Sequence, residues 1–202
     1  MMVEVCDAKI PRPSLPMART PTTSIPLGFL APEFELPDAR TGRLLSSADL
    51  FANGPTVVVF MCNHCPFVIH LLDAFVDFAR EYEARGVQVV AISSNDVINY
   101  PQDDVPLMKQ LAEEKDFSFP YLYDETQEVA RAYDAACTPD FSVFDANRRC
   151  VYRGQFDGSR PGNDVPITGE DIRRVCETLL AGEAVSSLDQ IPSIGCNIKW
   201  RE

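Results

Sequence analysis

The longest run of apolar, β-branched residues in the chain lies at 56–61 and predicts a strand that is buried on both faces. Its sequence is Thr-Val-Val-Val-Phe-Met, without the polar alternation of a half-buried strand. Apolar residues then recur at helical spacing from Phe67 to Tyr82, after Pro66, which suits the first position of a helix. A second β-branched run follows at 87–92. Because a long crossover helix joins parallel neighbours, the three segments predict a βαβ unit.

Weaker patterns predict shorter elements on both sides of this unit. They are two short strands at 34–38 and 43–46, a helix over 105–115, a short strand at 119–123 whose Pro120 indicates an edge or a strand end, a hairpin of 141–144 with 150–153, and a last helix that ends before Gly182. Together with the parallel pair, the hairpin makes the expected sheet mixed. The order of elements predicts an α/β fold, a central mixed β-sheet flanked by helices.

Proline content and periodicity divide the chain into three parts. Seven of the 16 prolines lie between Pro11 and Pro37, so residues 1–26 are expected to form an extended arm that lacks many backbone donors. Residues 27–182 carry the periodic segments and are expected to form the domain. Residues 183–202 show no clear periodicity, and we expect a C-terminal tail docked on the domain.

Charge and cysteine usage narrow the classes of partner and compartment. The formal net charge is −12, which repels phosphate backbones and anionic membranes, so no nucleic acid or membrane partner is expected. Seven scattered cysteines are not the even framework of a small secreted domain, and Met1 to Leu27 holds no apolar run of signal-peptide length. These features favour the cytoplasm. A slightly basic, Ser- and Thr-containing start leaves organelle import as an alternative.

Cys62 and Cys65 are separated by two residues at the predicted junction of strand and helix. Thiols at this spacing can close a small disulfide ring, and a helix N-terminus stabilises thiolate over thiol. The alternatives are two buried apolar cysteines or half of a zinc site. Zinc generally takes about four ligands, whereas the chain has no second such pair and only two histidines, His64 and His70. We therefore expect redox chemistry and no metal or other cofactor.

His64 lies between the two cysteines. An imidazolium beside a thiolate lowers the pKa of that thiol and favours the reduced form of the pair. The alternative is an exposed loop residue without a chemical role.

The strand, cysteine pair, helix and strand, followed by Thr138-Pro139 before a hairpin and a last helix, resemble the thioredoxin fold. The chain is most similar to a peroxiredoxin-like branch of the alkyl hydroperoxide reductase and thiol-specific antioxidant (AhpC/TSA) family that keeps a thioredoxin-type C-x-x-C. The resemblance runs from about Glu33 to the C-terminus through residues 119–125, 137–141, 152–157, 159–163 and the Cys196 tail. It implies that Cys62, at an exposed N-terminal position, is the nucleophile and that Cys65 is the resolving thiol. It also implies a cis Thr138–Pro139 bond opposite the pair.

Four further residues have two interpretations each. Cys137 is either an auxiliary thiol near the redox centre or a small buried filler. By the same resemblance, Cys196 is a second resolving thiol, unless it is buried under the tail. Arg153 and Arg160 either orient an anionic or peroxide substrate or simply solvate the surface.

The chain departs from the peroxiredoxin pattern Pro-x-x-x-Thr-x-x-Cys, because Val59 replaces the threonine when Cys62 is taken as the peroxidatic thiol. It also has no acid on the 56–61 strand to accept a proton. The sequence therefore predicts a thiol–disulfide oxidoreductase with an antioxidant or redox role, whose partner is a protein or a low-molecular-weight thiol or disulfide. The alternatives are a thiol-dependent peroxidase and a non-catalytic or metal-binding thioredoxin-like module. The oligomeric state stays open.

Overall fold

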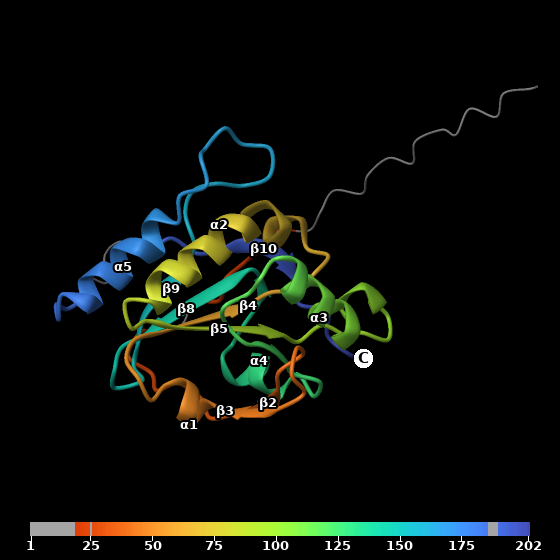
Figure 1. Ribbon diagram of the computed structural model, residues 1–202. Coiled ribbons are helices and arrows are strands. Elements are labelled where there is room, and N and C mark those ends of the chain that lie inside the picture. The colour runs from red at the N-terminus through yellow and green to blue at the C-terminus, as the bar shows by residue number, and fades with distance from the viewer. Residues whose placement is uncertain (1–18, 25, 186–189) are drawn as a thin grey trace, which may run out of the picture.

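A five-stranded mixed sheet of order β6-β5-β4-β8-β9 forms the centre of the computed structural model, which describes residues 19–24, 26–185 and 190–202 (Figure 1). Its strands are β4 (Thr56–Phe60), β5 (Gln88–Ser93), β6 (Tyr121–Tyr123), β8 (Asp140–Phe144) and β9 (Cys150–Gly154). Strands β4, β5 and β6 run parallel, and β8 and β9 are antiparallel additions. The predicted mixed sheet is confirmed, with the Thr56 run at its centre.

Helices and a hairpin cover the two faces of this sheet (Figure 1). One face carries α2 (Pro66–Glu83), α3 (Val105–Glu114) and α5 (Glu170–Leu180); the other carries α1 (Ser47–Leu50), α4 (Glu128–Ala132) and the hairpin of β2 (Glu35–Pro37) with β3 (Leu44–Ser46). Side chains of β4 alternate between the layers: Val57 and Val59 join one apolar cluster, Val58 and Phe60 the other. Burial on both faces explains why the strand has no polar alternation. The thioredoxin-like α/β architecture is thereby confirmed.

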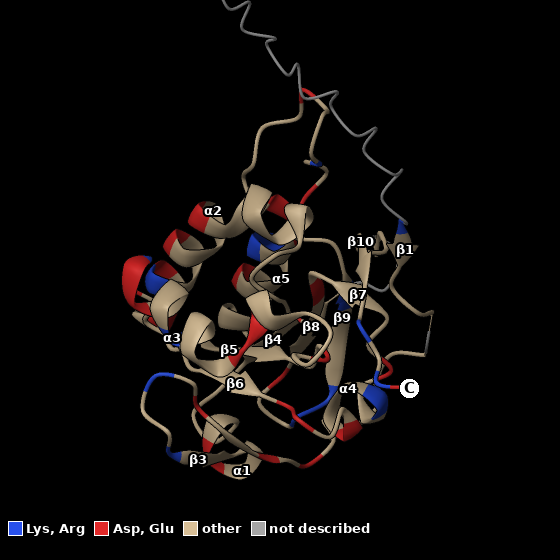
Figure 2. Ribbon diagram, turned by 90° about the vertical axis from the view of Figure 1, so that its right-hand side faces the viewer, with Lys and Arg blue, Asp and Glu red and all other residues tan. Residues whose placement is uncertain are grey.

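A second, smaller sheet joins the two ends of the described chain. Its order is β1 (Thr20–Pro21), β10 (Ile194–Asn197) and β7 (Cys137–Thr138), all antiparallel (Figure 2). Gly195 is paired with Thr20, and Cys196 is paired with Thr138. Most of the expected arm, and residues 186–189 of the expected tail, lie outside the described residues.

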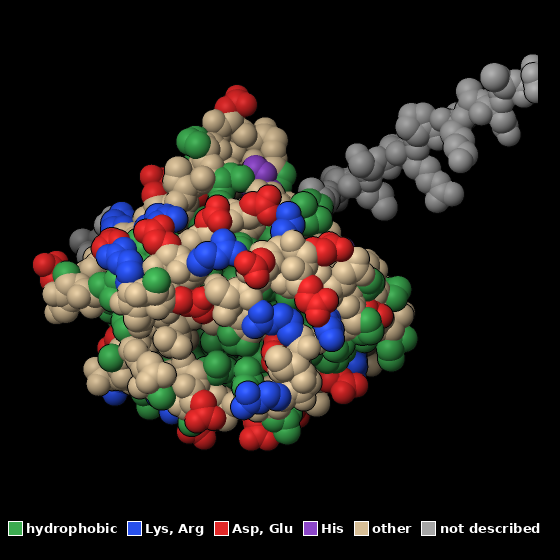
Figure 3. All heavy atoms as spheres, viewed as in Figure 1, with side chains coloured by type: hydrophobic (Ala, Val, Ile, Leu, Met, Phe, Trp, Pro, Cys, Tyr) green, Lys and Arg blue, Asp and Glu red, His purple; other side chains and the backbone are tan. Residues whose placement is uncertain are grey.

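The surface over α2 and α3 carries interspersed basic and acidic side chains (Figure 3). Several of them are paired, among them Arg80 with Asp116 at 3.2 Å and Lys115 with Asp73 at 2.7 Å. Exposed pairs of this kind contribute little to stability. Among the described residues, we find no helix with the length and apolar character needed to cross a membrane.

Candidate active site

The turn between β4 and α2 carries the cysteine pair. Cys65 is the N-cap of α2, with extended backbone angles of φ −69° and ψ 120°, and Pro66 occupies the first helical position. Proline costs no hydrogen bond at this position, because the N–H of any residue there would have no acceptor inside the helix. The free N–H of Val68, one turn on, hydrogen-bonds the sulfur of Cys65. Strand and helix thus place this sulfur at the positive end of the helix dipole.

Both thiols are covered by protein. Cys62 is 1% exposed and Cys65 is 0% exposed, so the expectation that Cys62 occupies an exposed position is wrong. Thr138 contacts both: its Oγ1 lies 3.6 Å from Cys62 Sγ, and its carbonyl oxygen lies 3.0 Å from Cys65 Sγ. The Thr138–Pro139 peptide bond is cis and lies opposite the pair, as the resemblance implies. A difference in access therefore does not distinguish the roles of the two cysteines.

His64 is held by a carboxylate that sequence reasoning missed. Nδ1 of His64 lies 2.6 Å from Oδ2 of Asp103, and Sγ of Cys62 lies 3.9 Å from the same nitrogen. Oδ1 of Asp103 accepts from the backbone N–H of Asn63 at 2.9 Å, and Asn95 Nδ2 donates to Oδ2 at 2.8 Å. Tyr100 stacks on the imidazole at 5.7 Å. The histidine is therefore a fixed, partly exposed member of the site rather than a free loop residue.

Asp103 supplies the acid that the 56–61 strand lacks. It is 0% exposed and lies in η1 (Pro101–Asp103), in the loop after β5. The carboxyl ends of parallel strands meet at one edge of a sheet, so a polar loop that follows β5 reaches the turn that follows β4. The signal in the sequence was the acidic, polar stretch at 95–104.

Three thiols share one local environment, and their pKa values move in opposite directions. Hydrogen bonds from Cys196 and Cys62 lower the pKa of Cys65, because they stabilise its thiolate. The bond to Cys65, together with burial and the charge of Asp103, raises the pKa of Cys62. The corresponding bond and burial raise the pKa of Cys196. The 3.0 Å contact with Thr138 O requires a protonated Cys65 and so opposes this shift, but several donors converge on the thiolate and outweigh it.

The tail covers the pair from the side of Thr138. Cys196, half-buried in β10, packs against the apolar cluster that contains both Cys62 and Cys65. Beyond β10, Lys199 N–H donates to Asn95 Oδ1, and Lys199 O accepts from the N–H of Asp96, each at 2.8 Å. The tail therefore connects β7 to the loop that carries Asp103.

Arg153 is a buried cation with internal partners. It is 6% exposed, and its guanidinium donates to the carbonyl oxygens of Tyr133 and Asp134, each at 2.5 Å, and pairs with buried Asp140 at 3.6 Å. The interpretation that it solvates the surface is therefore wrong, whereas a substrate contact by Arg153, which also borders a pocket with Thr22 and Gln190, stays a prediction. Burial explains this, because each charged donor needs an internal acceptor.

Cys137 lies beside this buried charge and away from solvent. It is 0% exposed, its thiol donates to Pro139 O at 3.5 Å, and burial raises its pKa well above the ordinary value. These features favour the packing interpretation over an auxiliary thiol.

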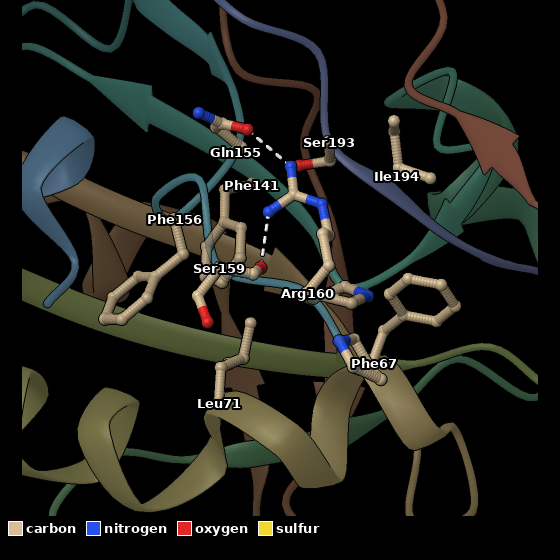
Figure 4. Close-up of a pocket in the computed structure, with 11 residues that line it drawn as sticks. Phe67, Leu71, Phe141, Gln155, Phe156, Ser159, Arg160, Ser193 and Ile194 are labelled. Atoms are coloured by element: carbon tan, nitrogen blue, oxygen red, sulfur yellow. Dashed lines mark hydrogen bonds between the residues drawn. The ribbon is translucent and has the colours of Figure 1, made fainter. Parts of the chain in front are cut away.

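Arg160 crosses a small cavity next to the cis proline (Figure 4). The cavity holds about 10 Å³, room for about one water molecule, and is lined by Phe67, Pro139 and Phe156 among others. The guanidinium donates to the carbonyl oxygens of Asp157 and Ser159 at 2.6 Å and to the side chain of Gln155. A substrate contact by Arg160 stays a prediction.

One group of side chains has the donor atoms of a metal site. Cys62 Sγ, His64 Nδ1 and a carboxylate oxygen of Asp103 all lie within 4.8 Å of one another. Thiolate, imidazole and carboxylate are ligands that zinc accepts. Cys65 is not in this group, so only one thiol of the pair belongs to it.

A thiol pair at a strand-to-helix turn, opposite a cis proline on this sheet, defines a redox protein of the thioredoxin fold. The AhpC/TSA family model matches residues 27–153, and the chain belongs to that family. An uncharacterised conserved protein from Geobacillus kaustophilus is 51% identical, with a TM-score of 0.90, over 93% of this chain and 98% of that one.

Two less similar structures share the fold. A peroxidoxin from Mycobacterium tuberculosis is 22% identical, with a TM-score of 0.58, over 77% of this chain and 96% of its own. A thiol:disulfide interchange protein from Chlorobium tepidum is 20% identical, with a TM-score of 0.59, over 78% and 99%. A search of curated proteins gives no match. Family and fold together indicate an oxidoreductase.

Proposed function

We propose that the protein is a thiol–disulfide oxidoreductase that works through a Cys62–Cys65 dithiol–disulfide couple. The observation that supports this most is that both thiols of the strand-to-helix turn contact one residue: Oγ1 of Thr138 lies 3.6 Å from Cys62 Sγ, and its carbonyl oxygen lies 3.0 Å from Cys65 Sγ. Two thiols held close together can close to a disulfide once one of them is ionised. The thiol:disulfide interchange protein with the same fold supports the proposal by its description.

The reaction proceeds in two exchange steps. Cys62, once ionised, attacks one sulfur of a substrate disulfide; a mixed disulfide forms and the first substrate thiol leaves. The thiolate of Cys65 then attacks Cys62 Sγ, so that the Cys62–Cys65 bond forms and the second substrate thiol leaves. Two electrons pass from the dithiol to the substrate, a protein disulfide or a low-molecular-weight disulfide.

His64 and Asp103 act on the first step. The imidazole nitrogen 3.9 Å from Cys62 Sγ can donate a hydrogen bond that stabilises the Cys62 thiolate, against the opposing charge of Asp103. Asp103 holds the ring at that place through its 2.6 Å contact. Both are positioning residues for the couple.

A redox titration tests the proposal. The wild-type protein is equilibrated with mixtures of reduced and oxidised glutathione, and its Cys62–Cys65 bond is quantified by trapping free thiols. We expect a reversible two-electron transition that forms the Cys62–Cys65 bond, together with reduction of a small disulfide; in Cys62→Ser this bond cannot form and the disulfide reduction is diminished. A protein without such a transition, or a Cys62→Ser variant with undiminished disulfide reduction, contradicts the proposal.

A metal-binding module is the second candidate, favoured by the Cys62, His64 and Asp103 donor group. Calorimetric titration of the reduced protein with Zn²⁺ tests it. Tight one-to-one binding that is lost in Asp103→Asn supports this candidate. No heat of binding above that of the Asp103→Asn protein counts against it.

Peroxidase activity has weaker support. Val59 is 1% exposed and offers no hydroxyl, and the two arginines expected from sequence are bound to other partners. The hydroxyl nearest to Cys62 Sγ is that of Thr138, at 3.6 Å. Fast thiol-dependent consumption of hydrogen peroxide that is lost with either cysteine would establish this alternative, as the peroxidoxin neighbour's name suggests.

A further inference from the structure

Strand β10 pairs along one edge of β7, next to the cysteine pair. It pairs with Thr138, and with the residue before it, in an antiparallel register. Thr138 is also the residue whose backbone oxygen lies 3.0 Å from Cys65 Sγ. An open strand edge here would take up an extended peptide, with backbone hydrogen bonds for affinity. In this protein the chain's own tail occupies that position.

Gly195 sets how closely this tail approaches. A β-carbon added at residue 195 would collide with the carbonyl oxygen of Thr138 and lie 2.6 Å from its carbonyl carbon. The three nearest atoms all belong to the backbone of Thr138 and Pro139, so the backbone itself would have to shift. Only glycine allows β10 to lie against the cis peptide bond at this distance.

The next residue, Cys196, is thereby brought to the thiol pair. It is paired with Thr138, packs on the cluster that contains Cys62 and Cys65, and exchanges a hydrogen bond with Cys65. The other described cysteines outside the pair have different surroundings: the thiols of Cys137 and Cys150 donate to carbonyl oxygens, and Cys176 lies within α5. Cys196 is thus the third thiol at Cys65.

We propose that Cys196 is a third exchange thiol. It displaces Cys62 from its disulfide with Cys65 and so forms a Cys65–Cys196 disulfide. This rests on the proposed couple, because the starting species is the Cys62–Cys65 disulfide made by reducing a substrate. The thiolate of Cys196 attacks Cys65 Sγ, the Cys65–Cys196 bond forms, the Cys62–Cys65 bond breaks, and Cys62 leaves as a thiolate that takes up the proton lost by Cys196. No further oxidant is needed, since one disulfide replaces another.

This exchange would leave Cys62 free while the protein stays oxidised. The bond would also fasten β10 to the N-terminus of α2, so the tail would be tied down in the oxidised form and released on reduction. The Cys65–Cys196 disulfide would then couple the oxidation state of the protein to the position of β10 over the cysteine pair.

The test uses the full-length Cys62→Ser protein, treated with oxidised glutathione after full reduction. Cys65 first forms a mixed disulfide with glutathione. Cys196 then attacks Cys65 and releases the glutathione thiol. We expect the Cys65–Cys196 peptide pair to be the main product in a non-reducing digest analysed by mass spectrometry. In Cys62→Ser/Cys196→Ser, the glutathione adduct on Cys65 should persist about tenfold longer or more, because no neighbouring thiol removes it.

Two control variants test whether formation of the Cys65–Cys196 disulfide depends on Cys196 rather than on Cys137, and on the close approach of β10. Cys62→Ser/Cys137→Ser should still form Cys65–Cys196. Gly195→Ala in the Cys62→Ser background should lower its yield several-fold, because the strand can no longer approach. Trp200, the single tryptophan, lies on the tail under Arg131, so its fluorescence reports that the tail is docked in each variant.

A persistent glutathione adduct in Cys62→Ser protein whose tail is docked, or pairing of Cys65 with Cys137, overturns this inference. The two proposals fail separately. If wild-type protein shows the Cys62–Cys65 couple but the Cys62→Ser protein forms no Cys65–Cys196 bond, only the third thiol is refuted. If that bond forms but the wild type reduces no disulfide, the proposed function is refuted.

Discussion

Two pairs of cysteines are equally buried and have different surroundings. Cys62 and Cys65 are 1% and 0% exposed, and Cys150 and Cys176 are also 1% and 0% exposed. Burial raises the pKa of both Cys150 and Cys176 to about 12. Cys65 is desolvated as well, yet its pKa is lowered, because thiols and a helix N–H donate to its sulfur.

The comparison shows that neighbours, and not exposure, separate the two pairs. Apolar surroundings penalise the thiolate in all four cases. Of these four cysteines, only Cys65 has a pKa that is lowered by hydrogen bonds from neighbouring thiols. The following changes test this contrast, from the largest expected effect to the smallest.

Replacing Cys65 by serine should have the largest effect. Disulfide reduction should fall to background, about a thousandfold or more, because no thiolate remains to resolve the mixed disulfide. Cys150→Ser is the matched control, since a serine hydroxyl can still donate to Tyr152 O as the thiol does at 3.4 Å. Turnover of a small disulfide is the measurement. Equal loss in both variants would remove the contrast between the pairs.

A variant of Arg153 tests the same contrast between a buried residue with a structural role and a residue that contacts substrate. Arg153→Met should lower the free energy of unfolding by about 3–5 kcal/mol, because Asp140 and two carbonyl oxygens lose a buried cation. Urea denaturation measures this, with Arg80→Met at an exposed pair as a control expected to change stability by about 1 kcal/mol or less. The KM for disulfide should be unchanged. A raised KM with an unchanged free energy of unfolding would contradict this prediction and indicate that Arg153 contacts substrate.

Removing the charge of Asp103 should make Cys62 more reactive. The bond to Cys65 and burial raise the pKa of Cys62, and the charge of Asp103 raises it further, so Asp103→Asn should shift the pH profile of Cys62 alkylation to lower pH. At a pH below the midpoint of the profile the Cys62 thiol is protonated and unreactive, and at a pH above it the thiolate reacts. Iodoacetamide labelling resolved by mass spectrometry measures the shift, with the exposed Asp116→Asn as control. A profile that moves to higher pH would show that Asp103 assists ionisation.

Shortening Cys176 should have the smallest effect. Cys176→Ala removes one buried sulfur from the face of α5 and should cost about 1 kcal/mol, with disulfide reduction unchanged. Thermal unfolding and the turnover assay measure the two quantities. A loss of activity without a loss of stability would give Cys176 a role that its surroundings do not explain.

The fold was largely predictable because its signals are local. The continuous apolar run at 56–61 predicts β4, buried on both faces, and the helical spacing after Pro66 predicts α2, which ends at Glu83. Pro120 places the next strand at an edge, and β6 is indeed the edge of the main sheet. Each of these follows from the burial or backbone chemistry of consecutive residues.

The site was predictable only in part, because its other members come from distant segments. Spacing alone identified Cys62 and Cys65. The contact of Asp103 with His64 depends on how the loop after β5 folds against the turn after β4, and no local pattern encodes it. The burial of Cys62 was missed because it depends on contacts with residues distant in sequence, such as Thr138. The burial of Arg153 was missed for a similar reason, since its acceptors lie at the end of α4.

The β1–β10–β7 sheet also affects the order in which the protein folds. Its contacts close very long loops: Thr22 bonds Asp140 across 118 residues and Ser193 across 171 residues. Loop closure of this length is entropically costly, and contacts of high sequence separation form slowly, so this sheet is expected to assemble after the local elements. Until it does, Cys62 and Cys65 lack the cover of Thr138 while other thiols of the chain are still accessible. Recovery of correctly folded protein should therefore depend on a reductant that is withdrawn only after the tail has docked.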